Sequence, residues 1–233
     1  MMIEKLINSP ADLHELASSF RKTHPIFRGL SDSSFQLIPR FGRSIIKNRE
    51  FRSKNPTFSY VIDQAKENVV LNQFKILTAP HLTSRPVNEW EWLAIAQHHG
   101  LPTRLMDWTS NPLVAAYFAT SYSPSKSDTV IYVISNKYTL KEISFEKSPF
   151  DLDKPAVFTP RHTTQRITAQ SGVFVINPIV DEPFCCDGME KWIVSKKCRI
   201  EMEIMLCRYG ITHASMFPGL DGIAKFLVSD YGL

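Results

Sequence analysis

The sequence predicts a single α+β domain, in which a small mixed sheet packs against helices across all 233 residues. Three observations lead to this prediction. Helical stretches with clear start and stop signals occur beside short runs of β-branched residues. No repeat and no low-complexity linker divides the chain. At roughly 150 residues per domain, the length allows one large domain or two small ones, and the missing linker favours one.

The first half of the chain shows two helices and a strand. Ser9 followed by Pro10 and Asp12 is a typical helix start, with a capping hydroxyl, a proline at the first helical position and an acid in the first turn. Residues 26–29 read as a short strand that ends at a glycine. Apolar residues recur at helical spacing over 57–78, which predicts a second helix.

The clearest local signals lie in the middle of the chain. Asn88 with Glu91 three residues later is a capping-box pattern, and Gly100 ends the helix that follows. A polar turn is expected over 103–108, between this helix and a buried small-residue helix over 113–120.

The last part of the chain is expected to supply the other strands and three helical stretches. The strand candidates are 129–134, 172–176 and 192–194. A helix is expected over 196–209, where Gly210 ends it, and two short helical stretches flank Pro218 and Gly219.

The composition is that of an ordinary globular protein. With 43% hydrophobic and 21% charged residues, it excludes a disordered chain, a collagen-like repeat and a coiled-coil rod. The net charge of +4 is too small to require a nucleic-acid partner. No apolar run approaches the ~20 residues of a membrane helix, and the first residues lack a signal-peptide pattern. The four cysteines show no C-x-x-C spacing, so we expect reduced thiols and a cytoplasmic protein without membrane contact.

Two segments are candidates for binding chemistry. Arg28 between Phe27 and Gly29 could hold a phosphate or carboxylate with its planar guanidinium, or could form a structural pair with Asp107. The segment 103–110 is dense in hydrogen-bonding groups between two apolar helices, so it is a structural network or a site. The ligand-binding candidates in these segments are Arg28, Gly29, Thr103, Arg104, Asp107, Thr109 and Ser110.

The adjacent histidines suggest acid–base chemistry rather than metal binding. His98 and His99 point about 100° apart on a helix, so they do not naturally share one ion, and no metal is expected. Either histidine could act as a general acid or base beside the polar turn.

A basic run follows the first strand. Its cations include Arg40, Arg43, Lys47, Arg49 and Arg52. Phe41 and Phe51 are interleaved with them, as base stacking requires. The run is a solvated charged face or, alternatively, a nucleic-acid contact.

Several of these strings resemble the FRG domain family. The resemblance rests on Phe27-Arg28-Gly29 and on AQHHGLPTRLMDWTSNPLVAAYFA at 96–119, and it extends over about residues 24–227. The block 166–174 resembles the family's R-I-x-A-Q-x-G-x-F, which adds Gln170 to the ligand-binding candidates. The resemblance implies a small bacterial or phage-encoded intracellular protein, with a role as a toxin or in phage defence.

The order of motifs also resembles ADP-ribosyltransferases of the Arg/Ser-Thr-Ser/Glu type. Arg28, then Thr109 and Ser110 before a small-residue helix, then Glu201 and Glu203 follow that order, although Trp108 replaces the first serine. This resemblance implies an ADP-ribosyltransferase-like fold in which the arginine binds a phosphate of NAD and the hydroxyls hold the ribose. A late carboxylate, Glu203 or Glu201, would then stabilise the ribosyl cation.

These observations lead to one hypothesis and two alternatives. The hypothesis is an Arg-anchored pocket for a nucleotide-like ligand, with NAD as the substrate of ADP-ribosyl transfer or NAD cleavage. The alternatives are a non-catalytic module that binds nucleic acid and a protein-interaction module of a defence system. The sequence does not separate an enzyme from a binding protein, and it names no protein partner or inhibitor.

Overall fold

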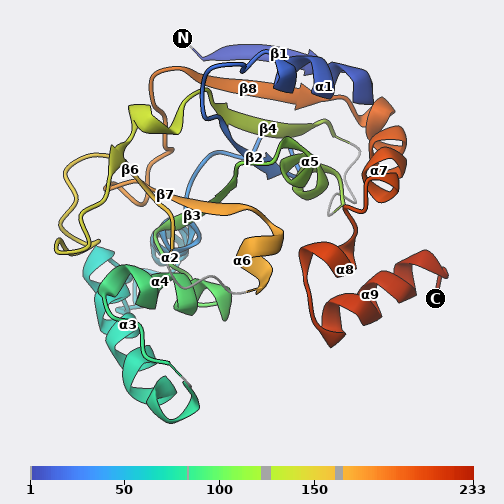
Figure 1. Ribbon diagram of the computed structural model, residues 1–233. Coiled ribbons are helices and arrows are strands. Elements are labelled where there is room, and N and C mark those ends of the chain that lie inside the picture. Colours follow the sequence, from blue (N-terminus) through green and yellow to red (C-terminus); the bar gives the residue numbers. More distant parts are fainter. Residues whose placement is uncertain (1, 83, 122–126, 161–164) are drawn as a thin grey trace.

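The fold of the chain is seen in a computed structural model that describes residues 2–82, 84–121, 127–160 and 165–233. Within these residues, eight strands form one mixed sheet in the order β1-β8-β4-β2-β3-β7-β6-β5 (Figure 1). The strands are β1 (Ile3–Ile7), β2 (Ile26–Leu30), β3 (Leu105–Thr109), β4 (Thr129–Ile134), β5 (Lys141–Glu142), β6 (Ala156–Phe158), β7 (Gly172–Ile176) and β8 (Met189–Val194). The outermost pairs, β1–β8 and β5–β6, are parallel, and all other pairs are antiparallel.

Helices pack against this sheet or extend from it. They are α1 (Pro10–Ser18), α2 (Arg40–Lys54), α3 (Gln64–Thr78), α4 (Glu89–His98), α5 (Pro112–Thr120), α6 (Gln165–Ala169), α7 (Arg199–Arg208), α8 (His213–Met216) and α9 (Leu220–Asp230). Three 3-10 turns, η1 (Ala79–His81), η2 (Lys137–Thr139) and η3 (Lys196–Cys198), complete the described elements. The predicted α+β class with a mixed sheet is confirmed, although the sheet is larger than the small one expected.

Local capping explains where the predicted helices begin. The Ser9 hydroxyl accepts from the backbone N–H of Asp12, and the Asp12 carboxylate accepts from the N–H of Ser9, which completes a capping box. Asn88 accepts from the N–H of Glu91 at the start of α4. At the end of that helix Gly100 has φ +91°, the left-handed region that a glycine enters without strain.

One face of the sheet carries two separate helix layers. On the β8–β4–β2 half, α1, α5 and α7 pack over a core that includes Phe27, Ile131 and Trp192. On the β3–β7–β6 half, α3 and α4 pack over a second core that includes Leu105 and Phe174. The two cores lie on the same face of the sheet. Side chains alternate between the two faces along each strand, residues paired across neighbouring strands share a face, and the core residues named here all fall on one face by this pairing. The helices therefore leave the sheet uncovered where one layer ends and the other begins, above β2 and β3.

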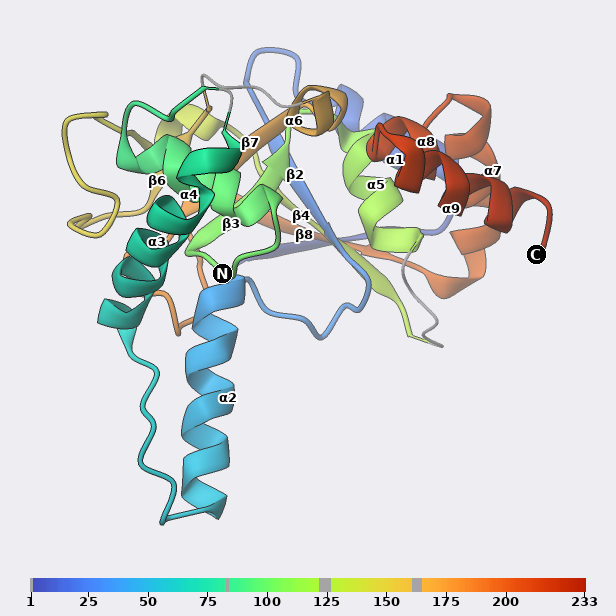
Figure 2. The ribbon, with the colours of Figure 1, turned by 90° about the horizontal axis from the view of Figure 1, so that it is seen from below.

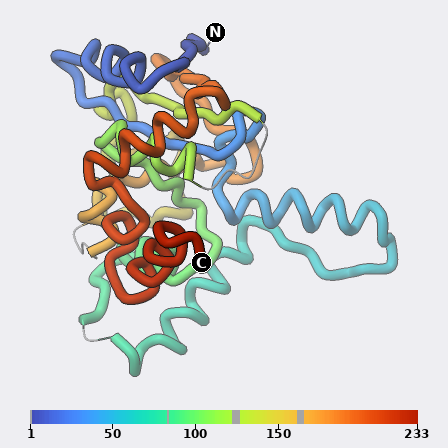
Figure 3. Tube along the Cα trace, turned by 90° about the vertical axis from the view of Figure 1, so that its right-hand side faces the viewer, coloured from blue at the N-terminus to red at the C-terminus, as the bar shows by residue number. Residues whose placement is uncertain are grey.

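The structure corrects two expectations and adds one helix. The segment 103–108, expected as a polar turn, supplies most of β3, a strand in the middle of the sheet. The helix expected over 57–78 begins only at Gln64, where Asp63 caps it. The basic run itself is a helix, α2, which projects from the body of the molecule beside the chain that leads to α3 (Figures 2 and 3).

Candidate functional site

The gap between the helix layers exposes one polar residue of β3. Asp107 shares its side of the sheet with Leu105 and Thr109, which are both buried, yet its own side chain is 66% exposed. It remains exposed although α5 packs mainly on β2 and to a lesser extent on β3, and α4 packs on β3. A solvent-accessible carboxylate therefore stands on the sheet between two buried cores.

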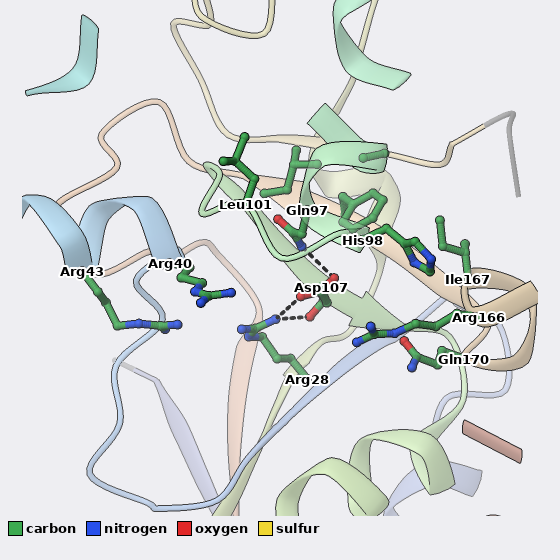
Figure 4. A pocket seen from close by; sticks show the side chains of 13 residues that line it. Arg28, Arg40, Arg43, Gln97, His98, Leu101, Asp107, Arg166, Ile167 and Gln170 are labelled. Carbon is green, nitrogen blue, oxygen red and sulfur yellow. Dashed lines mark hydrogen bonds and ion pairs between the residues drawn. The ribbon is translucent and has the colours of Figure 1, made fainter. Parts of the chain in front are cut away.

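A cavity of about 200 Å³ opens beside Asp107, and we call it the arginine hollow. Its cationic side chains come from three elements: Arg28 from β2, Arg40 and Arg43 from α2, and Arg166 from α6 (Figure 4). Asp107 is the only carboxylate among the described residues that line it. The other polar side chains of the wall are Gln97, His98 and Gln170.

Arg28 lines this hollow and contacts β3. Strands β2 and β3 pair only at Phe27 and Thr109, and beyond that pair the backbone carbonyl of Asp107 accepts from Arg28 Nη1. The same Nη1 lies 3.8 Å from Asp107 Oδ2 (Figure 4). Among the described residues, none accepts from Arg28 Nε or Nη2, so part of the planar guanidinium remains available to a ligand.

The other three arginines are held by backbone or ring contacts rather than by acids. Arg40 Nη1 donates to the carbonyl of Gly100 at 3.0 Å, and Arg43 Nη1 donates to that of Ile38 at 2.9 Å. The guanidinium carbon of Arg166 lies 4.6 Å from the ring centroid of Phe217, a cation–π contact. Within the described part of the chain, none of the three forms an ion pair. The arginine hollow therefore has an excess of positive charge.

Burial first, and neighbouring cationic groups second, lower the pKa values of three groups in the hollow. Burial lowers the pKa of Arg28, with Asp107 opposing the shift and Arg43 adding to it. Burial and the neighbouring Arg40 lower the pKa of Arg43. Burial, His99 and Arg166 lower the pKa of His98. Each shift means that the surroundings disfavour the cationic form, and a bound anion would relieve that penalty.

A chain of hydrogen bonds orients the Asp107 carboxylate. Gln97 Nε2 donates to Asp107 Oδ1 at 2.7 Å, and the buried Thr103 hydroxyl donates to Gln97 Oε1. With Arg28 near the other carboxylate oxygen, Asp107 is held from two sides although it is exposed. The arrangement keeps one carboxylate oriented at the mouth of a cationic cavity.

A second cavity, of about 150 Å³, adjoins the first, and we call it the aromatic hollow. It shares Arg28, Asp107, Arg166 and Gln170 with the arginine hollow. Its remaining wall is mostly apolar and consists of Phe27, Gly29, Trp108, Thr109, Val114 and Phe118. The shared residues thus separate a cationic cavity from an apolar one.

Three predicted ligand residues of this region serve the fold through most of their contacts. A Cβ on Gly29 would lie 1.9 Å from the carbonyl oxygen of Ala115, so this glycine lets α5 pack against β2. The Thr109 hydroxyl donates to the carbonyl of Gln170 at 2.7 Å and accepts from the N–H of Asn111. Gln170 Nε2 donates to the carbonyl of Met216 at 2.9 Å. All three still line the aromatic hollow.

Arg104 and Thr103 line neither hollow. Arg104 is 2% exposed, its Nε donates to Glu67 Oε2 at 2.8 Å, and its backbone N–H donates to Glu67 Oε1 at 2.6 Å. This buried ion pair ties α3 to the start of β3. Arg104 thus makes structural contacts and does not reach either hollow. Thr103 also lies outside the hollows and supports Gln97 through a hydrogen bond.

The two glutamates expected to complete the site lie elsewhere. Glu203 is on α7, pairs with Arg199 at 3.0 Å and lines a different cavity, beside His213 and Lys225. Glu201 is exposed on the same helix. The segment is a helix rather than a late strand, so the structure does not bring Glu201 or Glu203 together with Arg28 in either hollow.

The remaining candidates divide in the same way. His98 lines the arginine hollow, whereas His99 is exposed beyond it and packs edge-on against the His98 ring at 5.0 Å. Ser110 is exposed and lines neither hollow. In the described part of the chain, no three His, Cys, Asp or Glu residues are grouped as metal ligands would be. The described residues also contain no helix that is both long and apolar enough to cross a membrane.

The fold places the cations of the basic run in different surroundings. Arg40 and Arg43 face the arginine hollow, while Arg49 pairs with Asp181 at 2.6 Å on another side of α2. Arg49 and Arg52 both line a separate cavity of about 250 Å³, together with Asp63 and Asp181. Lys47 stays exposed. The cations of the expected single basic surface therefore occupy three environments: the arginine hollow, the separate cavity, and the exposed helix surface at Lys47.

Sequence reasoning did not place Arg166 or Gln97 in the site. Both lie in strings that carried the family resemblance. Arg166 precedes Gln170 by four residues, and the N–H of Gln170, just after α6, donates to the Arg166 carbonyl at 3.0 Å, so the helical spacing continues to Gln170. That spacing was a usable signal. The hydrogen bond between Gln97 and Asp107 left no signal in the sequence, because it joins a helix to a strand.

These features define a class: an α+β protein with an arginine-lined hollow at the seam between two helix layers of one sheet. The family model of the FRG domain matches residues 23–128, and this chain carries an FRG domain. The matched region contains the Phe27-Arg28-Gly29 tripeptide, α2, Gln97 and Asp107, whereas Arg166 and Gln170 follow it. No curated protein and no solved structure matches the chain.

Proposed function

We propose that the arginine hollow binds the pyrophosphate of a nucleotide, with NAD as the ligand to test first. The observation that carries this proposal is four guanidinium groups around about 200 Å³ with one carboxylate among the described lining residues. Guanidinium matches phosphate oxygens with two parallel hydrogen bonds, and the cations gain most where an anion replaces lost water. The depressed pKa values of Arg28 and Arg43 support the same inference.

The aromatic hollow supplies a place for a ring. At about 150 Å³ it is smaller than the ~300–1,000 Å³ of ordinary ligand pockets, and the arginine hollow is smaller as well. A nucleotide would therefore span both cavities, with phosphates near Arg28 and a base or nicotinamide ring near Phe27 and Phe118. Arg166 and Gln170, which line both cavities, would lie along the connecting ribose.

Cleavage of NAD is the reaction that this arrangement supports best. The bond between the ribose C1′ and the nicotinamide nitrogen would break, and its electron pair would leave with nicotinamide. Water, or a hydroxyl of a target, would add to C1′ and release one proton. Asp107 takes the role first expected of Glu203 or Glu201, because it is the carboxylate that Gln97 and Arg28 hold at the junction of the two hollows. Its negative charge would stabilise the ribosyl cation.

Binding and cleavage are tested separately. We expect ADP-ribose and NAD to bind in calorimetry and adenosine to bind at least tenfold more weakly, because adenosine lacks the pyrophosphate. Nicotinamide release by the purified protein, alone and with cell lysate, measures cleavage. Arg166→Ala should weaken ADP-ribose binding, and Arg21→Ala, which removes an exposed arginine that lines neither cavity, should not. Equal binding of adenosine and ADP-ribose would contradict the pyrophosphate assignment.

The proposed toxin or defence role follows from the family resemblance and from NAD cleavage together. Induced expression of the wild-type chain in bacteria should slow growth and lower cellular NAD. Arg28→Lys, expressed to the same level, should do neither. Growth arrest by both proteins with unchanged NAD would contradict this role.

A further inference from the structure

One face of α2 carries a continuous stripe of exposed residues. They are Arg40, Arg43, Lys47, Phe51 and Lys54, at spacings i, i+3, i+7, i+11 and i+14, and all five are exposed. At about 100° per residue these positions fall within roughly 80° of one another around the helix. The opposite side of the helix contains its buried residues, Phe41, Gly42 and Ile45. We call the stripe the cationic face of α2.

The cationic face joins the arginine hollow to an aromatic cluster. At 1.5 Å rise per residue, it extends on the order of 21 Å along the helix. Arg40 and Arg43 line the hollow at one end. Near the other end the ring centroids of Phe51 and Phe58 are 5.0 Å apart, and those of Phe58 and Tyr60 are 6.4 Å apart. Figures 2 and 3 show α2 projecting from the body, which leaves this length of helix accessible.

The charge of this face is not compensated. Within the described residues, no carboxylate lies within 4.0 Å of a nitrogen of Arg40, Arg43, Lys47 or Lys54, whereas Arg49 on another side of the helix is paired with Asp181. Glu50 lies at the edge of the stripe and is the only acid of α2. The three aromatic side chains at the tip remain 40–51% exposed, so their rings are partly uncovered. A polyanion with flat groups fits both properties.

We propose that the cationic face of α2 binds a single strand of nucleic acid, with phosphates on the cations and bases on Phe51 and Tyr60. The first three cations are spaced about 4.5–6 Å along the helix axis and Lys54 follows Lys47 after about 10.5 Å, so they offer a series of phosphate contacts. A single strand is favoured over a duplex because only unpaired bases expose the faces that stack on aromatic side chains. The strand would run toward the arginine hollow, so Arg40 and Arg43 would serve both ligands. The inference goes beyond the nucleotide site, because Lys47, Phe51 and Lys54 lie outside both hollows.

The test measures the anisotropy of labelled oligonucleotides at several salt concentrations. We use a dT20 and an rU20 strand, since RNA and DNA offer the same phosphates and stacking faces. Binding should weaken steeply with salt, and Lys47→Ala with Lys54→Ala should flatten the log–log slope by about 1.4, at ~0.7 per single-strand phosphate contact. The matched control is Lys22→Ala with Lys197→Ala, which removes the same charge from exposed sites outside α2 and should leave the slope unchanged. Phe51→Ala should lower affinity roughly fivefold or more at constant slope.

Four results would overturn the proposal. They are no binding at low salt, an equal effect of the two double variants, equal competition by a duplex of the same length, and equal competition by polyglutamate. The last would indicate an acidic protein partner instead. Arg28→Lys keeps α2 intact and should change oligonucleotide affinity less than twofold while it weakens ADP-ribose. Failure of strand binding and failure of the nucleotide proposal are thereby distinguished.

Discussion

The guanidinium of Arg28 donates to the backbone carbonyl of Asp107 and lies 3.8 Å from its carboxylate, where β2 and β3 stop pairing. The two partners are unequally accessible, because the Arg28 side chain is 16% exposed and that of Asp107 is 66% exposed. The pair is therefore neither a buried structural ion pair nor a free surface contact. A mostly buried cation faces a cavity, and water reaches its carboxylate partner. This asymmetry determines what mutations should do.

Arg28→Lys should weaken ADP-ribose binding with little effect on stability. Lysine keeps the charge but loses the planar fork, and a charge-assisted hydrogen bond is worth about 1.5–3 kcal/mol, so affinity should fall roughly 10- to 100-fold. Because the Asp107 carboxylate is hydrated, removing its partner strands no buried charge, and the free energy of unfolding should change by less than about 1 kcal/mol. Calorimetry and urea unfolding measure the two effects. A large stability loss that Asp107→Asn rescues would make Arg28 part of the scaffold.

Asp107→Asn should separate binding from chemistry. The change removes the negative charge that repels a pyrophosphate, so ADP-ribose affinity should stay equal or rise. Nicotinamide release should fall by at least 100-fold, since the ribosyl cation loses its stabilising carboxylate. Glu203→Gln and Glu201→Gln are the comparison, and both should retain wild-type release because neither glutamate lines the hollows. Loss of activity in Glu203→Gln, with Asp107→Asn active, would restore the late glutamate as the reactive group.

Ligand affinity should depend on pH through His98. Its pKa is lowered by burial, by His99 and by Arg166, and Asp107 lies in the same hollow. Since the unfolded chain binds this proton more tightly, stability should fall as pH drops below about 6.5. A bound pyrophosphate favours the charged ring, so ADP-ribose affinity should rise over the same range, by at most about tenfold per pH unit. His98→Gln should abolish this rise and His99→Gln should keep it, as measured by calorimetry between pH 5.5 and 7.5.

Gly29→Ala should severely destabilise the fold. The added Cβ would lie 1.9 Å from the carbonyl oxygen of Ala115 and 2.7 Å from the backbone nitrogen of Ala119, so α5 must move as a unit. We expect a loss on the order of 3 kcal/mol or more. Gly100→Ala is the matched control, because its Cβ meets nothing within 4 Å and only the positive φ opposes it, at about 1–2 kcal/mol. Thermal unfolding should rank the two in this order, and equal losses would contradict the packing argument.

Glu67→Gln should destabilise the chain by about 3–5 kcal/mol, because it leaves the buried Arg104 without its counter-charge. Glu89→Gln breaks the Lys75 pair on the neighbouring helix, where both side chains are partly exposed, and should cost less than about 1 kcal/mol. Urea unfolding of both variants measures the difference. A small effect of Glu67→Gln would show that Arg104 finds water or another acceptor, and would reopen its assignment as scaffold.

The sequence predicted the secondary structure best where a signal involves neighbouring residues. Ser9 and Asn88 cap α1 and α4 as expected, and Gly100 ends α4. The sequence did not predict strand β3, because polar residues such as Asp107 interrupt the alternation of apolar and polar residues that indicates a strand. The segment becomes a strand through its pairing with β2 and β7. In β3, hydrogen bonding within the sheet outweighed the local preference of the residues for a turn.

The candidate site shows the same division. Arg28 and Asp107 were both identified from sequence, and so was the question whether they pair. Arg40 and Arg43 were assigned to one basic surface with Arg49, because a run of cations does not reveal which face of a helix points at a cavity. Arg104 was assigned to the ligand because its partner, Glu67, lies on a helix that packs against it only in the folded chain.

The sequence by itself determined the elements whose signals act over a single turn, because a cap such as Ser9 with Asp12 needs only residues three apart. Tertiary structure alone decided which candidate side chains meet, because Arg28 meets Asp107 across 79 residues of chain. Which cations share a cavity, and which carboxylate stands among them, depends on how two helix layers cover one sheet. That arrangement joins Arg28 to Asp107 and leaves Glu203 on α7 beside a different cavity.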